Sequence, residues 1–152
     1  MNAYDRRAWT SYRQMAETVE RLVARDLYRL TSLSEADYGV LLALRWNPDM
    51  IWRLRDLSDY LAWSKSRVAH QLSRMERRGY VVRGDSTGVG AAIWLSPSGT
   101  AAVDKATPAY QDSVNRHVFD VLTAGQIAAL TDISAALLQA EANKDDGAIA
   151  DA

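Results

Sequence analysis

The 152-residue sequence contains no cysteine. Without cysteine, the chain cannot form a disulfide, a cysteine zinc site or a thiol-based oxidation sensor. Long hydrophobic runs are also missing, since the longest, such as residues 40–44, fall far short of the ~20 apolar residues that a membrane-spanning helix needs. Residues 1–14 are charged and aromatic rather than apolar, unlike a signal sequence. We therefore expect a cytoplasmic protein with no membrane partner.

The common sequence motifs of enzymes are absent as well. The chain has no Gly-x-Ser-x-Gly elbow, no glycine-rich phosphate loop and no motif of paired carboxylates. His117 has Asp120 one helical turn later, a pair that suits metal binding or pH sensing, but two ligands do not make a site. A histidine satisfied at an interface is the favoured interpretation. The sequence predicts a protein that is not an enzyme and has no metal and no cofactor.

The most informative stretch is residues 65–78, which has the pattern of a helix with one narrow apolar stripe. The stripe consists of Val68, Leu72 and Met75. Ser64 or Ser66 is suited to cap the first amides of this helix, and Gly79 stands where the chain must turn left-handed to leave it. Such a helix packs by one side and presents polar and cationic groups on the others, as reading a DNA major groove requires.

The sequence around this helix completes a winged helix-turn-helix. Residues 54–61 form a shorter bracing helix before it, and the β-prone run 80–82 and residues 92–95 form a hairpin after it. Residues 64–83 hold six Lys or Arg against one acid, a net charge of +5, whereas the whole chain is at −1. A plain solvated helix is the alternative, but the helix, glycine stop, hairpin and local charge together favour a DNA-binding module.

The rest of the chain predicts long helices on both sides of this module. We expect dimerisation helices at 4–30 and 97–142, and the second range contains a capping box from Thr123 to Gln126. Between them we expect a helix from Ser34 to about residue 46 and a short strand at 50–54. Residues 143–152 lack periodicity, which predicts a disordered tail. The apolar stripe of 4–30 fits either a plain core or a helix from a second copy. The fold class is one mainly α domain, 1–152, with a small β-hairpin and a DNA-binding module at 34–95.

Several motifs resemble the MarR family of bacterial transcriptional regulators, in order and spacing, from about Trp9 to Leu138. They are Leu33-Ser34-x-x-Asp37-Tyr38-x-x-Leu41, Leu57-Ser58-x-x-Leu61, Ser64-Lys65-Ser66-Arg67-Val68, Arg74-Met75-Glu76-Arg77-Arg78-Gly79-Tyr80-Val81 and Leu95-Ser96-Pro97-Ser98-Gly99. The resemblance implies a homodimer with two winged modules that read a pseudo-palindromic site in double-stranded DNA. It further implies a repressor that a small aromatic or phenolic ligand releases from DNA.

The resemblance also assigns DNA contacts to individual residues. The major-groove positions are Ser64, Lys65, Ser66, Arg67, His70 and Gln71. Among them we expect Arg67 and Gln71 to touch base edges, because a fork of donors suits guanine and an amide suits adenine. The positions expected at the DNA backbone are Arg74, Arg77, Arg78 and Arg83, and the first three are also suited to pair with Glu76.

The chain departs from the family pattern at two places. The turn before the recognition helix has Ala62 where a glycine is usual, which predicts some backbone strain. The wing comprises Asp85, Ser86, Thr87, Gly88, Val89 and Gly90, and Val89 stands in the slot of an arginine that enters the minor groove. Valine cannot supply the cation that a narrow minor groove attracts. Arg83, at the base of the wing, is suited to compensate in part.

Aromatic residues suggest a ligand cleft between the dimerisation helices and the module. Its candidate residues are Trp9, Tyr12, Arg13, Tyr38, Arg116 and His117. Aromatic residues at helical spacing also fit a plain core, so both interpretations stay open. An alternative function is a ligand-binding or protein-interaction module of the same fold with weakened DNA binding.

Overall fold

The structure is a computed structural model that describes residues 1–47, 52–85 and 91–150. It divides into two compact units, Met1–Ser113 and Val114–Ala152, where the sequence led us to expect one domain. The first unit holds α1 (Ala3–Thr31), α2 (Glu35–Trp46), α3 (Leu54–Tyr60), α4 (Lys65–Arg77), β1 (Val81–Asp85), β2 (Ala91–Leu95) and α5 (Pro97–Val114). The second holds a π-helical segment, η1 (Asn115–Phe119), and α6 (Ala124–Ala150).

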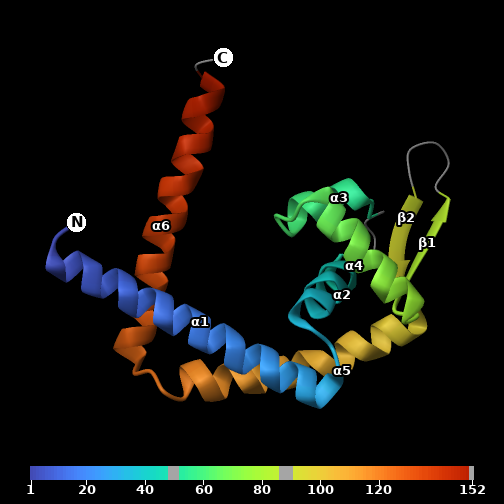
Figure 1. Ribbon diagram of the computed structural model, residues 1–152, viewed down its shortest axis with the longest axis horizontal. Helices are drawn as coiled ribbons and strands as arrows, with labels where there is room; N and C mark the ends of the chain where they lie inside the picture. The colour runs from blue at the N-terminus through green and yellow to red at the C-terminus, as the bar shows by residue number, and fades with distance from the viewer. Residues whose placement is uncertain (48–51, 86–90, 151–152) are drawn as a thin grey trace. The chain divides into compact units, whose positions relative to one another are not determined.

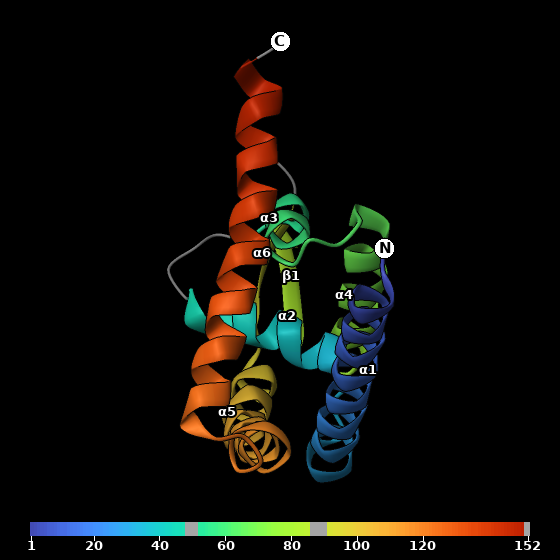
Figure 2. The same cartoon turned by 90° about the vertical axis from the view of Figure 1, so that its left-hand side faces the viewer.

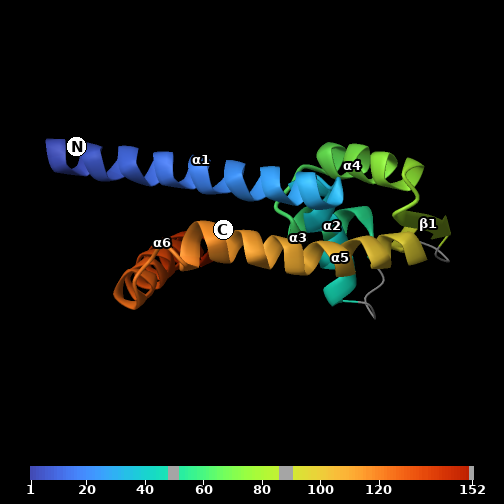
Figure 3. The same ribbon diagram turned by 90° about the horizontal axis from the view of Figure 1, so that it is seen from below.

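Helix α2 lies at the centre of the first unit, with α5 on one side and α3 and α4 on the other (Figures 1 and 3). Its apolar residues Val40 and Leu41 are fully buried. They belong to one core cluster that also takes in the apolar stripe of α4 and residues Val81 and Ile93 of the hairpin. The predicted stripe is confirmed, since Val68, Leu72 and Met75 are each 0% exposed.

Helix α1 is buried only near its C-terminal end. Its buried residues are Val23, Asp26 and Leu27, while the aromatic residues of its N-terminal half are exposed. Asp26 is a charged residue on this buried side, and its carboxylate accepts a hydrogen bond of 3.2 Å from the Ser113 hydroxyl of α5. The helix ends at Ser32, whose φ of 60° turns the chain toward α2. A polar contact thus replaces one apolar contact between α1 and α5.

The hairpin is a two-stranded antiparallel sheet in which Val81 pairs with Leu95. Trp52 joins it through an isolated bridge, because the Ile93 amide donates to the Trp52 carbonyl at 2.8 Å. Of the strand expected at 50–54, residues 50 and 51 lie outside the described residues, and α3 already begins at Leu54. Gly99 lets α5 start against this sheet, because a Cβ there would lie 2.0 Å from the Tyr80 carbonyl oxygen.

Three helical segments occupy the range 97–142, in which the sequence predicts dimerisation helices. α5 ends at Val114, and η1 follows it before α6 begins. The predicted capping box is confirmed: the Gln126 amide donates to the Thr123 hydroxyl at 3.3 Å, and the Thr123 amide donates to the Gln126 side-chain oxygen at 2.9 Å. α6 then runs as one helix to Ala150 (Figure 2), although a disordered tail was expected from Asn143. Helix extension adds one hydrogen bond per residue and does not need an apolar stripe.

Within the described residues, no single helix is both long and apolar enough to cross a membrane. The bent pair 97–119 and 124–140 passes that test only when its two helices are taken together, by length and composition.

Candidate nucleic-acid interface

The turn between α3 and α4 is held in a left-handed conformation. Ala62 has a φ of 51°, in the slot where a glycine was expected. A side chain in this conformation costs roughly 1 kcal/mol relative to glycine. Two hydrogen bonds between Ser58 and Trp63 offset this cost. The Ser58 hydroxyl donates to the Trp63 carbonyl at 2.6 Å, and the Ser58 carbonyl accepts from the Trp63 amide at 3.0 Å. Ser58 is 5% exposed. The start of α4 is therefore fixed relative to α3.

Helix α4 begins at the predicted cap. The Ser64 hydroxyl accepts from the Arg67 amide at 3.3 Å and lies 3.2 Å from the Ser66 hydroxyl. At its other end, Gly79 has a φ of 74°, which confirms the predicted stop. Five of the six predicted major-groove residues are exposed, namely Ser64, Lys65, Ser66, Arg67 and His70. These five residues form the solvent-exposed part of the surface predicted to contact the major groove.

Arg67 stacks on Trp63, a residue that the sequence analysis did not include in the site. The guanidinium carbon lies 3.9 Å from the centre of the Trp63 ring, a cation–π contact. The two residues are four apart in the sequence, and that spacing was the available signal. The contact holds the Arg67 side chain over the first turn of α4. The sequence predicts that Arg67 meets a base edge from this turn.

Gln71 does not lie on the exposed face of α4. Its side chain is 2% exposed, and its amide nitrogen donates to the Asp37 carboxylate of α2 at 2.7 Å. Its side-chain oxygen accepts a hydrogen bond from the Arg74 guanidinium. The prediction that Gln71 touches a base edge is therefore wrong for this conformation, because the amide is already bonded inside the protein.

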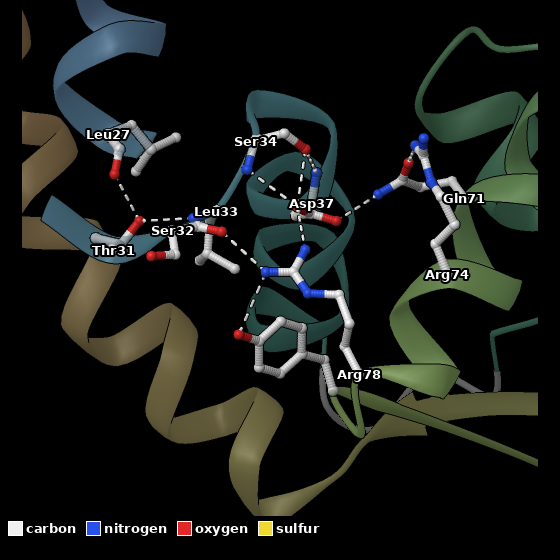
Figure 4. Close-up of polar contacts among 10 residues, drawn as sticks. Leu27, Thr31, Ser32, Leu33, Ser34, Asp37, Gln71, Arg74 and Arg78 are labelled. Carbon is white, nitrogen blue, oxygen red and sulfur yellow. Dashed lines mark hydrogen bonds and ion pairs between the residues drawn. The ribbon is translucent and has the colours of Figure 1, made fainter. Parts of the chain in front are cut away.

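Arg78, at the end of α4, forms an ion pair with Asp37 of α2 (Figure 4). Its guanidinium lies 2.7 Å from the Asp37 carboxylate, whose side chain is 6% exposed, and donates to the Ser32 carbonyl at 2.8 Å. It also covers the Tyr80 ring at 4.8 Å. Arg78 pairs with Asp37 and not with Glu76, and its expected contact with a phosphate stays a prediction. The ion pair ties the end of α4 to the junction of α1 and α2.

The protonation of this contact follows from its hydrogen bonds. Burial alone would raise the pKa of Asp37, but hydrogen bonds from Ser34 and the ion pair with Arg78 outweigh it and lower the pKa. Burial would likewise lower the pKa of Arg78, and the Asp37 carboxylate raises it instead. Both groups are therefore charged at neutral pH.

Glu76 pairs with Arg83 rather than with the arginines of its own helix. The Arg83 Nε and Nη2 atoms lie 3.0 and 2.5 Å from one Glu76 oxygen, and Nη2 also donates to the Ser73 hydroxyl at 3.0 Å. The cation expected to compensate for Val89 is thus already paired in the free protein. Arg77, by contrast, is exposed and donates only a long bond of 3.3 Å to the Ser73 carbonyl among the contacts described.

The wing and the ligand cleft stay predictions. Asp85 is the last residue of β1 and pairs with Ala91, and wing residues 86–90 lie outside the described residues. Tyr38 is 5% exposed, lies in the core and packs on Tyr110 at 4.9 Å between ring centres. The other cleft candidates are distributed over α1 and the second unit: Trp9 and Tyr12 stack at 5.7 Å on exposed α1, Arg13 pairs with Glu17 at 2.7 Å, and Arg116 and His117 belong to η1.

No protein-family model and no curated protein matches the sequence. Solved structures do match it. Sco3205 of Streptomyces coelicolor, a MarR family transcriptional regulator in complex with DNA, is 28% identical over 92% of each chain, with a TM-score of 0.83. AbsC of the same organism, another MarR family regulator, is 23% identical over 94% of this chain and 97% of its own, with a TM-score of 0.84.

A third structure, a mutant of MarR from E. coli in complex with operator DNA, shares the fold with a TM-score of 0.76. It is 19% identical over 91% of this chain and 99% of its own. The likeness to Sco3205 extends over nearly all of both chains. The chain has the winged helix-turn-helix fold of these MarR family transcriptional regulators.

Proposed function

We propose that this protein is a repressor that binds a pseudo-palindromic operator as a homodimer. The observation that carries the proposal is the exposed cationic surface of α4, held by an apolar stripe that is completely buried. The cations of this surface are Lys65, Arg67, Arg74 and Arg77. Relatives of the same fold, Sco3205 and the E. coli MarR mutant, have been solved with DNA, which supports the same partner here.

In this proposal, α4 enters the major groove with its N-terminal turn foremost. Arg67 donates to a guanine edge, and Lys65, Ser66 and His70 lie beside it on the same exposed turns. Arg74 and Arg77, further along the helix, meet phosphates and fix the register of the protein on the duplex. Arg67 thus contributes sequence selectivity, and the other arginines contribute affinity.

The homodimer is supported by apolar side chains that the single chain leaves uncovered. On α1, Tyr4, Trp9, Tyr12 and Met15 are 46–82% exposed, and on α6, Ile133, Leu137 and Leu138 are 57–71% exposed. Large exposed apolar surfaces of this kind mark interfaces. A second copy of the chain would cover them and would bring two α4 helices to successive major grooves, about 34 Å apart.

Selection from a library of random duplexes tests the operator directly. We expect enrichment of an inverted repeat with half-site centres about ten base pairs apart or a multiple of that spacing. Lack of any enriched sequence would contradict the proposal.

Release of the selected duplex by a phenolic acid such as salicylate tests the proposed ligand control. Saturating binding of such acids without release of DNA would contradict ligand control.

A module of the same fold with weakened DNA binding is the second candidate. It is favoured by Val89 in the arginine slot of the wing and by Glu76, which already occupies Arg83. Substitution Val89→Arg separates the candidates. If the wing is the missing contact, this variant binds DNA more tightly and the slope of log affinity against log salt steepens by about one. Unchanged affinity and slope would show that the wing does not limit binding.

A further inference from the structure

Gln71 is a polar residue on the buried side of α4. It lies three residues after Val68 and four before Met75, so an apolar residue there would continue the stripe. A buried amide without partners is unfavourable, yet both ends of this amide are bonded. The nitrogen donates to Asp37, and the oxygen accepts from Arg74. The polar residue therefore connects the core to an arginine of the exposed surface.

The direction of these bonds is fixed by the chemistry of Asp37. An ionised carboxylate only accepts hydrogen bonds, so the NH₂ group of Gln71 must face it, and the carbonyl oxygen must face away, toward Arg74. Asp37 is itself held by the amide and hydroxyl of Ser34 at 3.0 and 2.8 Å and by Arg78 at 2.7 Å. Figure 4 shows this arrangement, with Asp37 between Gln71 and Arg78. The acceptor offered to Arg74 is thus anchored to α2.

Arg74 has a long side chain that would otherwise move freely in water. It is exposed, on the part of α4 assigned to phosphates, and its guanidinium donates to the anchored oxygen of Gln71. A guanidinium has five N–H donors, so one bond to Gln71 leaves others for a phosphate. Holding the group before binding reduces the entropy lost when the contact with DNA forms.

We propose that Gln71 is a positioning residue that holds Arg74 ready for a DNA phosphate and does not touch DNA itself. The proposal rests on the DNA binding proposed above. It adds that part of the affinity for DNA depends on the buried Gln71 side chain and on Asp37 of α2, which anchors it.

A double-mutant cycle in DNA binding tests this role. Gln71→Met removes both hydrogen bonds at nearly constant size. We expect it to weaken binding of the selected operator roughly three- to tenfold with a nearly unchanged salt slope, because Arg74 keeps its charge, whereas Arg74→Ala lowers the magnitude of the slope by about one. In the Arg74→Ala background, Gln71→Met should have no further effect. In the background of Arg77→Ala, the matched control that does not contact Gln71, the two losses should multiply.

Fold losses that multiply in the Arg74→Ala background, or equal operator affinity of Gln71→Met and the wild type, would overturn the proposal and leave Gln71 as a purely structural residue. Side-chain ¹⁵N relaxation of the wild-type protein gives a readout that needs no variant of Gln71. The Arg74 guanidinium should be more ordered than that of Arg77, and equal mobility would overturn the proposal. Absence of DNA binding by the wild-type protein would contradict the proposed function as well, whereas DNA binding with losses that multiply in the Arg74→Ala background would contradict this inference alone.

Discussion

Substitution Asp37→Asn removes the charge at the junction of α1, α2 and α4 without changing the size of the side chain. The carboxylate accepts four hydrogen bonds, from Ser34 (two), Arg78 and Gln71, at 2.7–3.0 Å. An asparagine offers one oxygen, so at least one donor would face its NH₂ group. Loss of a partner from a buried ion pair costs about 3–5 kcal/mol. We discount this cost because Arg78 is 38% exposed and water can solvate it.

We therefore expect Asp37→Asn to lower the free energy of unfolding by about 2 kcal/mol at pH 7. Urea denaturation followed by circular dichroism measures it, as a lower midpoint with an unchanged slope. Glu76→Gln is the matched control, because it breaks the more exposed pair with Arg83 and should cost less than about 1 kcal/mol. A loss below about 0.5 kcal/mol in Asp37→Asn would refute the reasoning, since it would mean that the carboxylate contributes nothing that an amide cannot.

The pH dependence of the same variant has a fixed sign. The pKa of Asp37 is lower in the folded protein than in the unfolded chain, where it is about 3.9. The stabilisation is therefore complete above the unfolded pKa and is lost as the pH falls through the folded pKa. The difference between wild type and Asp37→Asn should be constant from pH 7 to about pH 5 and should shrink below about pH 4. A difference that grows on acidification would contradict the direction of the shift.

Three further variants test other parts of the molecule. Trp63→Ala should release the Arg67 guanidinium and weaken operator binding by about 1 kcal/mol, with Trp63→Phe intermediate, by fluorescence anisotropy; equal affinity of all three proteins would contradict this. Gly99→Ala should lower the melting temperature, because its Cβ would meet the Tyr80 carbonyl. The control Gly125→Ala should not, because nothing lies within 4 Å of a Cβ there. Equal melting temperatures would rule out the close approach of Gly99 to Tyr80. Leu137→Asp should shift the dimer toward monomer in sedimentation equilibrium, and an unchanged mass would exclude this face.

The features predicted correctly from the sequence depend on local patterns. Ser64 and Gly79 bound the recognition helix because capping and left-handed turns select residue types over a few positions. Thr123 and Gln126 form their capping box for the same reason. The hairpin follows from β-prone runs separated by a glycine-bearing link. None of these features needs a contact between distant parts of the chain.

The contacts that the sequence did not predict join residues far apart in the chain. Gln71 and Arg78 both bind Asp37, 34 and 41 residues earlier, and side-chain type alone does not reveal such partners. A signal was nevertheless present, because Gln71 occupies a stripe position of α4 between Val68 and Met75. Asp26 likewise interrupts the stripe of α1 and meets Ser113 in the core. A polar residue at a stripe position is better interpreted as half of a buried polar pair than as part of the exposed face.

The most direct test of the central claim is a titration of the purified protein against duplexes from its own upstream region at several salt concentrations, beside Arg67→Ala. The account predicts saturable, sequence-selective binding whose log affinity falls linearly with log salt. It also predicts that Arg67→Ala loses about 1–3 kcal/mol and relaxes selectivity at one base pair of each half-site. Weak binding that is indifferent both to sequence and to Arg67 would contradict the claim that α4 reads DNA.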